Sequence, residues 1–546
     1  MRTTVNAKAR LFVAVVAPAL ALTATAQNAD PVAQTQNEWY QQSQQTLEQM
    51  LAVQPNANQA KNVIIFIADG ADPVSITATR ILDGQLKGAE GEGNVLSYET
   101  FPNVALIKTY TADSQVADSS PTASAWNSGV KSNNGTTGVN AQVEHNNCAS
   151  QKGNATTSIV ELAEMAGMST GTVSTARLTH ATPSANYAHT ANRDWESDAD
   201  LSDEAKQNGC TDIAAQLLAF PYGDGLEVAM GGGRSNFLPE TMTDPEDAEE
   251  TGARLDGQNL TRKWTSQYQN AAYVWNKKQF DAVDPATTDH LLGLFEPSHM
   301  QYEADRTDDP SGEPSLSEMT GKAIDILSKN DNGYVLQVEA GRVDHALHAN
   351  NAYRALTDNI EFAKTVQLTL GKVDLEDTLI LVTSDHGHTL AFAGYPERGN
   401  PILGLVKAVN EETGESEVVM AQDGKPYTTL GFLNGPGSVY YAEENDDGTV
   451  PEGAGRAPTR PNPANNKVQD KDYLQQALVP LDSETHGGTD VAAYAIGPRS
   501  FLVRGVVEQN YLFQVMNYAL NLTERAQQGS TTSGGSASGG SASGGN

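Results

Sequence analysis

Cysteine is scarce in this chain: among 546 residues only Cys148 and Cys210 occur. One pair of thiols cannot build a thiolate zinc site, so the cysteines play no part in any metal site. In an exported protein two cysteines are more often joined than free. Because the N-terminus has the features of an export signal, we predict a disulfide between Cys148 and Cys210.

Long apolar runs are absent apart from one near the start, at residues 11–22. Three basic residues precede this run and Ala24-Thr25-Ala26 follows it, which is the arrangement of a secretory signal peptide. Pro18 interrupts the run, which is too short to span a bilayer. We therefore predict a signal peptide over residues 1–26, export to the periplasm or the extracellular space, and a mature chain without a transmembrane span.

Positive charge is also scarce. Lys and Arg number 35 against 68 Asp and Glu, which gives a formal net charge of −33 at pH 7. This balance argues against a nucleic-acid-binding surface, because such surfaces neutralise backbone phosphates with basic residues. A large charge keeps a protein soluble at high ionic strength, where self-repulsion is screened. We hypothesise a salt-adapted, halophilic source and expect the unfolding temperature to rise with added NaCl; stability that fails to rise contradicts this.

Four apolar segments are typical of buried strands. They are residues 62–68, 334–338, 378–383 and 491–496. Their residues do not alternate between polar and apolar, and helical patterns such as residues 317–328 and 351–370 separate them. This combination indicates an α/β fold with a parallel sheet covered on both faces.

Acidic residues follow three of these strands. Asp69 comes directly after the first, Glu339 after the second, and Ser384-Asp385 after the third. In open parallel sheets, ligands bind beyond the carboxyl ends of the strands. A buried acid is costly unless a positive charge compensates it, so three such acids together predict a metal.

The rest of the chain suggests one large unit with an insertion. Residues 394–479 are rich in Gly, Pro, Asn and acids, and we interpret them as an inserted, partly exposed subdomain. Residues 529–546 are mostly Gly, Ser and Thr and predict a flexible tail. The folded domain is then expected over residues 27–528.

Histidines and acids recur at spacings that suit metal ligands. Asp344 and His348 would share one face of a helix, Asp385-His386 ends a strand, and His486 stands between Thr485 and two glycines. Each signal alone is weak, because such a pair is common on plain surface helices and an isolated His is usually a surface or hydrogen-bonded residue. Their joint occurrence is far more specific.

The stretch Val116-Ala117-Asp118-Ser119-Ser120-Pro121-Thr122 raises the question of a nucleophile, since no His or Lys lies nearby to take a proton. A helix starting near Ser120, with Pro121 in its first turn, would direct its positive N-terminus at Ser119. Asp118 is expected to bond to Arg193 or to a backbone amide.

In these residues the chain closely resembles the alkaline phosphatase family, from about residue 61 to about residue 522. Segments without chemistry, such as residues 230–234, 293–297 and 505–509, take part in the resemblance. It implies a three-layer α/β/α sandwich around a large, mostly parallel central sheet, in which the insertion forms a crown-like subdomain at a homodimer interface. It also implies hydrolysis of small phosphate monoesters through a covalent phosphoserine, with two Zn²⁺ and one Mg²⁺.

The resemblance carries the site residues over position by position. The first zinc would be held by Asp344, His348 and His486. The second would be held by Asp69, Asp385 and His386, with Ser119 both as its last ligand and as the nucleophile. Magnesium would be held by Asp69, Thr182 and Glu339, and Arg193 would grip two phosphate oxygens. Metal binding would then lower the pKa of the Ser119 hydroxyl and replace the missing general base.

Other features fit the animal-type members of the family. His180 and His345 are expected behind the metal ligands, together with Asp118, and the Cys148–Cys210 spacing fits the same type. Animal members also hold a structural Ca²⁺, and Phe295 and Glu296 match part of that site. Asp72 stands where many members have Gly, and adds a carboxylate close to the metals.

Three rival interpretations stay open at this point. A related sulfatase requires Arg at the position of Ala123, and a related phosphodiesterase would more often use Thr as nucleophile and lack the arginine. A secreted metal- or phosphate-binding protein without turnover would not need a positioned Ser119.

Overall fold

The computed structural model describes residues 34–439, 460–465 and 467–533, and the chain divides into two compact units, residues 1–54 and 55–546. The first unit contains α1 (Glu38–Ala52), which Asn37 caps at its N-terminus. The predicted signal peptide lies outside the described residues, and the expected domain start at residue 27 stays a prediction. Among the described helices, none is both long and apolar enough to cross a membrane.

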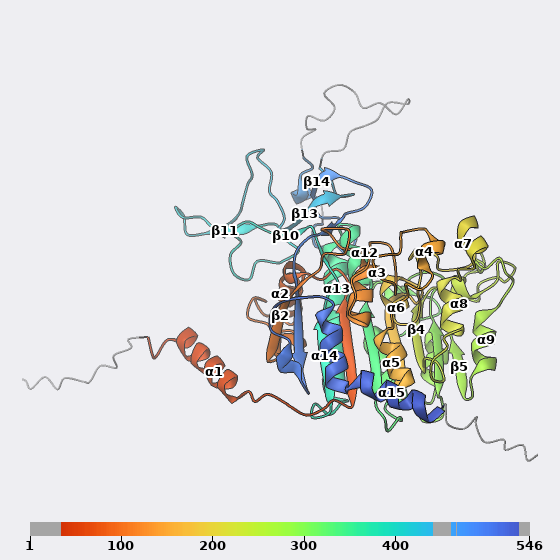
Figure 1. Cartoon of the computed structure of the whole chain (residues 1–546). Helices are drawn as coiled ribbons and strands as arrows, with labels where there is room; N and C mark the ends of the chain where they lie inside the picture. The colour runs from red at the N-terminus through yellow and green to blue at the C-terminus, as the bar shows by residue number, and fades with distance from the viewer. Residues whose placement is uncertain (1–33, 440–459, 466, 534–546) are drawn as a thin grey trace, which may run out of the picture. The chain divides into compact units, whose positions relative to one another are not determined.

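A ten-stranded sheet organises the second unit (Figure 1), in the order β17-β2-β16-β8-β1-β7-β3-β4-β6-β5. Every neighbouring pair is parallel except the two that involve β16. The strands are β1 (Asn62–Ala68), β2 (Asn103–Lys108), β3 (Ser169–Arg177), β4 (Val228–Gly232), β5 (Ala271–Val274), β6 (His290–Leu294), β7 (Tyr334–Ala340), β8 (Thr378–Thr383), β16 (Val491–Ile496) and β17 (Gly505–Glu508).

The mostly parallel sheet is confirmed, with one correction. Residues 491–496 do form a strand, β16, but it runs antiparallel to both β2 and β8. Its apolar pattern could not distinguish the two directions, because any central strand covered on both faces is apolar throughout.

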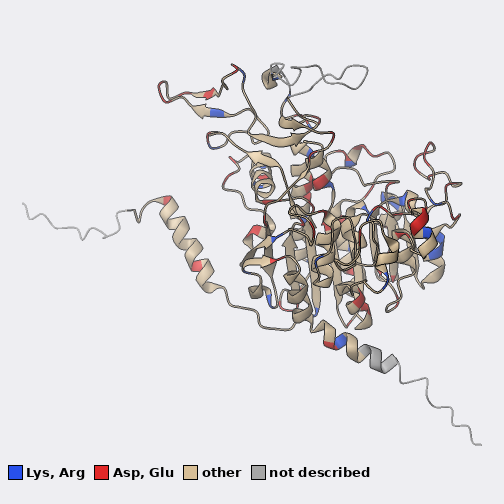
Figure 2. Cartoon of the chain, turned by 45° about the horizontal axis from the view of Figure 1, so that its top comes forward, with Lys and Arg blue, Asp and Glu red and all other residues tan. Residues whose placement is uncertain are grey.

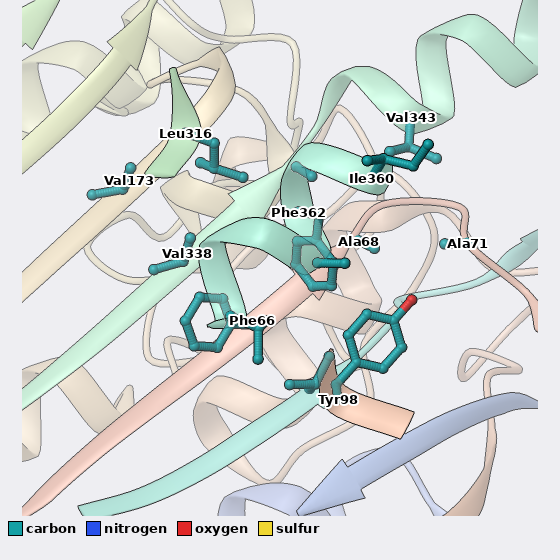
Figure 3. Close-up of a cluster of buried hydrophobic side chains, with 14 of the residues drawn as sticks. Phe66, Ala68, Ala71, Tyr98, Val173, Leu316, Val338, Val343, Ile360 and Phe362 are labelled. Atoms are coloured by element: carbon teal, nitrogen blue, oxygen red, sulfur yellow. The ribbon is translucent and has the colours of Figure 1, made fainter. Parts of the chain in front are cut away.

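Helices cover both faces of the sheet, as the three-layer prediction requires. Side chains of β1 alternate between two cores: Phe66 enters one and Ile65 the other. In the first core the Phe66 ring meets Phe362 edge-on at 6.0 Å, and Tyr98 lies 5.9 Å from Phe362 (Figure 3). Helices of the first face are α2 (Pro73–Leu86), α11 (Leu316–Leu327), α12 (Arg342–His348) and α13 (Ala352–Leu370).

The second face carries the helix that begins at Ser119. Its helices include α3 (Ser119–Ser128), α5 (Ile159–Met165), α8 (Ile213–Leu218), α9 (Leu260–Gln267) and α14 (Tyr511–Leu520). Smaller helices are α4 (Cys148–Gln151), α6 (Ala181–Ser184), α7 (Asp203–Asn208) and α10 (Lys277–Ala282). Short 3₁₀ turns are η1 (Ser97–Thr100), η2 (Arg234–Phe237), η3 (Arg306–Asp308), η4 (Pro463–Asn465) and η5 (Ser500–Leu502).

The predicted insertion takes part in two small sheets. One is built by β13 (Leu430–Gly435), β14 (Ala477–Pro480) and β10 (Leu390–Phe392), which lies just before the insertion; the other is the hairpin of β11 (Lys407–Val409) and β12 (Ser416–Val418). The last helix, α15 (Leu522–Ser533), extends five residues into the segment expected as a tail, so that segment is not irregular throughout. Residues 534–546 lie outside the description.

Cys148 and Cys210 form the predicted disulfide. The bridge closes a loop with a sequence separation of 62 residues, joining the start of α4 to the end of α7. In the chain-entropy account a loop of this length stabilises the fold by about 4 kcal/mol. Acidic residues are spread over the loops and helices of the chain (Figure 2) rather than gathered in one tail.

Candidate metal and phosphate site

Three buried carboxyl groups meet at the carboxyl ends of three adjacent strands. Ile67 of β1 pairs with Glu339 of β7 on one side and with Thr383 of β8 on the other. Asp69 and Asp385 follow β1 and β8 within two residues, and Asp69, Glu339 and Asp385 are each fully buried. The strand-end acids picked out in the sequence are therefore neighbours in space.

Four oxygens of these acids lack hydrogen-bond partners. Both carboxylate oxygens of Asp69, Oε1 of Glu339 and Oδ2 of Asp385 are buried without a hydrogen bond. Burial, reinforced by neighbouring carboxylates, raises the pKa of Asp69 well above its usual value, and burial raises the pKa of Glu339 to about 7. Unpartnered buried acids are costly, so this donor set fits bound cations.

Asp344, His348 and His486 converge on one point. Nε2 of His348 lies 3.1 Å from Nε2 of His486, and Oδ1 of Asp344 lies 3.4 Å from each of those atoms. The Nδ1 atoms face backbone carbonyls, that of His348 at Glu484 and that of His486 at Ala117 (2.7 Å). Nδ1 therefore carries the proton in each ring and Nε2 offers its lone pair, which is how metal-binding imidazoles are oriented.

Ser119 lies at a second convergence, with His386. The Oγ of Ser119 is 3.0 Å from Nε2 of His386. That nitrogen also lies 3.1 Å from Oδ2 of Asp385 and 3.6 Å from Oδ1 of Asp69. The sequence shows no imidazole near Ser119; the fold supplies one from a segment more than 260 residues away.

A third group of donors is rich in oxygen. Asp69 and Glu339 lie together with His180 within 4.8 Å, and the buried Oγ1 of Thr182 has no hydrogen-bond partner. Oε2 of Glu339 accepts a 2.5 Å hydrogen bond from Ser174, a residue that the sequence did not mark. Carboxylate and hydroxyl oxygens are the ligands that Mg²⁺ prefers.

Arg193 borders this site and is held in place by two groups. Its Nη1 forms an ion pair with Oδ1 of Asp118, and its Nη2 donates to Nε2 of His180 (2.7 Å). Oδ2 of Asp118 in turn accepts from the backbone of Gly135 (2.9 Å) and from Ser120 Oγ (2.8 Å). Although burial opposes it, the Arg193 guanidinium lowers the pKa of Asp118 to about 2.

Two residues behind Asp344 were not predicted from the sequence. His388 is fully enclosed and donates to Oδ1 of Asp344 (2.7 Å) and to Oε2 of Glu484 (2.6 Å). Burial works against its charge, but these two carboxylates raise the pKa of His388 to about 10. Glu484 stands two residues before His486, and this closeness in the sequence could have indicated a role near the site. The antiparallel pairing of β9 (Gly387–His388) with β15 (His486–Gly487) could not be predicted from the sequence.

His180, His345 and His299 form a histidine cluster beside the oxygen-rich group. Their ring centroids are 4.0–5.4 Å apart, and Arg177 contacts Nε2 of His299 at 2.5 Å. His180 and His345 were expected near the metals; His299 was not, because its only sequence context is the loop after β6.

Asp72 has a local role that the sequence did not indicate. Its Oδ1 accepts from the amides of Val74 (3.0 Å) and Ser75 (2.9 Å), which caps the N-terminus of α2. Among the described residues, Asp72 belongs to none of the groups of donor atoms that could hold an ion.

A separate group of acids lies away from Ser119. Glu246, Glu296 and Asp309 bring carboxylate oxygens within 4.8 Å of one another, and Arg234 donates to Glu246 at 2.8 Å. Burial raises the pKa of Glu296 to about 7. Phe295, expected with Glu296, is buried beside it.

Comparisons with known proteins show the family of the chain. The family model described as alkaline phosphatase matches residues 60–522. The tissue-nonspecific alkaline phosphatase isozyme of Felis catus is 44% identical over 488 residues, or 88% of each chain, and that of Homo sapiens is 43% identical over the same length and shares. An alkaline phosphatase of Gadus morhua is 42% identical over 491 residues, covering 88% of this chain and 96% of the relative.

Solved structures support the fold alone. The alkaline phosphatase of Thermus thermophilus superposes with a TM-score of 0.58 at 24% identity, covering 88% of this chain and 96% of that one. The enzyme of the Antarctic bacterium TAB5 gives 0.55 at 21% identity, covering 85% and 99%.

Proposed function

The chain belongs to the alkaline phosphatase family and hydrolyses phosphate monoesters, and from that premise we propose that Ser119 is the nucleophile of a two-step, metal-dependent reaction. The observation that carries this proposal is the contact of Ser119 Oγ with His386 Nε2, beside unpartnered acids at three strand ends. Release of phosphate from p-nitrophenyl phosphate tests the activity, and capture of phosphate on Ser119 tests the route.

The donor sets fit two zinc ions and one magnesium ion. Asp344, His348 and His486 would hold the first zinc, and Asp69, Asp385 and His386 the second. The all-oxygen set of Asp69, Thr182 and Glu339 would hold magnesium. When bound, the ions would polarise the phosphoryl oxygens, stabilise charge on the attacking and leaving oxygens, and lower the pKa of the Ser119 hydroxyl.

The protein's own groups orient the reaction. Ser119 begins α3, so the backbone N–H groups and the positive dipole end of the helix N-terminus would lie beside the transferred phosphoryl group. Ser119 Oγ gives up its proton to water and attacks phosphorus. The bond between phosphorus and the leaving oxygen breaks, and that oxygen takes up a proton and departs as the alcohol. Water then cleaves the phosphoserine, which restores Ser119 and releases inorganic phosphate.

Arg193 holds the phosphoryl group during both steps. Its planar guanidinium can donate two parallel hydrogen bonds to two phosphate oxygens. Asp118 keeps one edge of the guanidinium in place through the ion pair, and His180 receives a second N–H. His180 and His345 would orient groups around the oxygen-rich set without touching phosphorus.

Replacing Arg193 by alanine is expected to lower kcat/KM for p-nitrophenyl phosphate by about 10- to 100-fold, since hydrogen bonds to a charged group contribute about 1.5–3 kcal/mol. Inhibition by inorganic phosphate should weaken in parallel. Arg193→Lys keeps the charge and should recover only part of the loss. Arg262→Ala removes an exposed guanidinium on α9 as a matched control. Unchanged phosphate inhibition in Arg193→Ala contradicts the role.

The sulfatase alternative finds no support in the site. The position after Thr122 at which a sulfatase needs Arg is Ala123, and that side chain is fully buried within α3. An arginine there would have to displace core packing rather than reach the substrate.

Several wider features of the protein stay proposals. We propose that the protein is exported and that residues 1–26 are cleaved off. We also propose that the folded domain spans residues 27–528, with a crown-like insertion at 394–479. A calcium ion would be held by Glu246, Glu296 and Asp309. A homodimer would cover the exposed side chains of Leu433, Leu478 and Val479 on the small sheet of the insertion. A monomeric mass by sedimentation would contradict the dimer.

A further inference from the structure

A cavity of about 670 Å³ opens at the end of the central sheet opposite to the phosphate site. Its lining includes Ser169 at the start of β3, Glu227 directly before β4, and His290 at the start of β6. These are the amino-terminal ends of parallel strands, whereas Asp69 and Glu339 lie at the carboxyl ends. The cavity is therefore separate from the chemistry at Ser119, and a ligand bound in it would be independent of the proposed function.

One buried carboxyl group lines the inner wall and a second lies behind it. Glu227 accepts from Ser169 Oγ and from the amide of Thr170, both at 2.7 Å, and is 9% exposed. Behind it, Glu164 accepts from Thr170 Oγ1 at 2.5 Å. Neither carboxyl group forms an ion pair with a described residue. Burial raises the pKa of Glu164 to about 10, with a further contribution from Glu227.

The remaining wall includes His290 and the Tyr268 hydroxyl, which is buried without a hydrogen-bond partner. His290 is 95% buried, since only 5% of it is exposed, and its Nδ1 lies 3.0 Å from the carbonyl of Leu226. Nδ1 therefore carries the proton, and Nε2 offers a lone pair 3.9 Å from Oδ2 of Asp224. The Tyr268 ring stacks on His290 at 4.2 Å and fixes its plane.

The lysine among the residues that line the cavity already has partners. Lys329 pairs with Asp289 at 2.8 Å and donates to the carbonyl of Thr288. Glu227 and Asp224 thus face the cavity with no positive charge assigned to them in the described chain, apart from the distant contact of Asp224 with His290. A ligand that complements this cavity would therefore be positively charged.

The acceptors are too far apart for a bare metal ion. The described groups of three or more donor atoms within 4.8 Å of one another do not include Glu227, Asp224 or His290. A ligand that matches Glu227, His290 and Asp224 would bring N–H donors and positive charge to more than one of them. Ile326 and the Tyr268 ring add apolar surface to the lining.

We propose that this cavity binds an aliphatic polyamine. One primary ammonium group donates to Glu227 and to Nε2 of His290, a second lies against the exposed carboxylate of Asp224, and the methylene chain packs on Ile326 and Tyr268. Binding supplies the positive charge that the buried carboxyl pair lacks, and so favours the ionised form of Glu227 and Glu164.

The test is calorimetric titration of the full-length, metal-loaded protein with spermidine at pH 8 and low salt. We expect one spermidine per chain, with a Kd of about 0.1 mM, and release of a proton. Proton release appears as a difference between the heats measured in Tris and in HEPES, because the two buffers have different ionisation enthalpies. The absence of saturable binding overturns the proposal.

Three variants separate a specific site from general attraction to an acidic protein. Glu227→Gln is expected to weaken spermidine binding at least about tenfold and to reduce proton release, since only Glu164 of the pair then stays ionisable. Asp224→Asn, on an exposed loop where folding is not at risk, should weaken it severalfold. Asp331→Asn removes one exposed acid outside the lining and should bind as the parent does. Equal binding by all four proteins, or stoichiometric displacement of spermidine by Mg²⁺ or Ca²⁺, overturns the assignment.

Discussion

Replacing Ser119 by alanine is expected to lower kcat for p-nitrophenyl phosphate by about four orders of magnitude or more. Ser119→Ala removes only the hydroxyl group, and the oxygen of that group is the atom that would form the bond to phosphorus. Its position 3.0 Å from Nε2 of His386 places it inside the donor cluster rather than at its rim. Binding of phosphate through Arg193 and the metals should persist, so inhibition constants should change far less than kcat.

Two measurements make this result specific to Ser119. Acid quenching of the parent enzyme with radiolabelled phosphate should leave label on the peptide that contains Ser119, and the variant should carry none. Ser120→Ala removes the next hydroxyl of the same helix, which bonds to Asp118, and is expected to lower kcat less than about tenfold. Undiminished turnover in Ser119→Ala would refute the assignment of the nucleophile.

The strands that position the site were predictable for a physical reason. Residues 62–68 and 378–383 are apolar because both faces of a central parallel strand are covered, and those two segments coincide with β1 and β8. An acid at the end of such a strand lies at the carboxyl edge of the sheet, so the sequence alone was enough to group Asp69, Glu339 and Asp385, although Glu339 is the second-last residue of β7 and does not follow it. The direction of β16 could not be predicted, because its pairing depends on partners distant in the sequence.

The layer behind the ligands could not be predicted, because its contacts cross elements. His388 reaches Asp344 and Glu484 only because β9 and β15 pair, and each strand is two residues long. His299 reaches His345 from a loop after β6. Short pairings and loops leave no periodic pattern in the sequence, whereas the proposed ligands are recognisable from their order and chemistry.

Removing the metals is expected to abolish activity and to make stability fall with rising pH. Exhaustive chelation should reduce hydrolysis of p-nitrophenyl phosphate at least about 100-fold. Zinc should restore most of it and magnesium the remainder, whereas Ca²⁺ alone should not, because Glu246, Glu296 and Asp309 lie in a separate group. Metal analysis of the loaded protein should find two zinc ions and one magnesium ion per chain; activity that survives chelation would exclude the mechanism.

The stability effect follows from the buried acids. In the protein without metals, burial raises the pKa of Asp69, Asp385 and Glu339 above the values of the unfolded chain. The folded state then holds more protons than the unfolded state once the pH exceeds about 4, so stability falls as the pH rises from there through the folded pKa values. Bound cations compensate the ionised carboxylates and remove that dependence.

Between pH 5 and pH 9 the unfolding temperature of the chelated protein should therefore fall more steeply than that of the loaded protein. Asp385→Asn removes one ionisable carboxyl from the cluster and should make the unfolding temperature of the chelated protein less dependent on pH. If the unfolding temperatures of chelated and loaded protein change with pH in parallel, the acids at the three strand ends do not bind the metals.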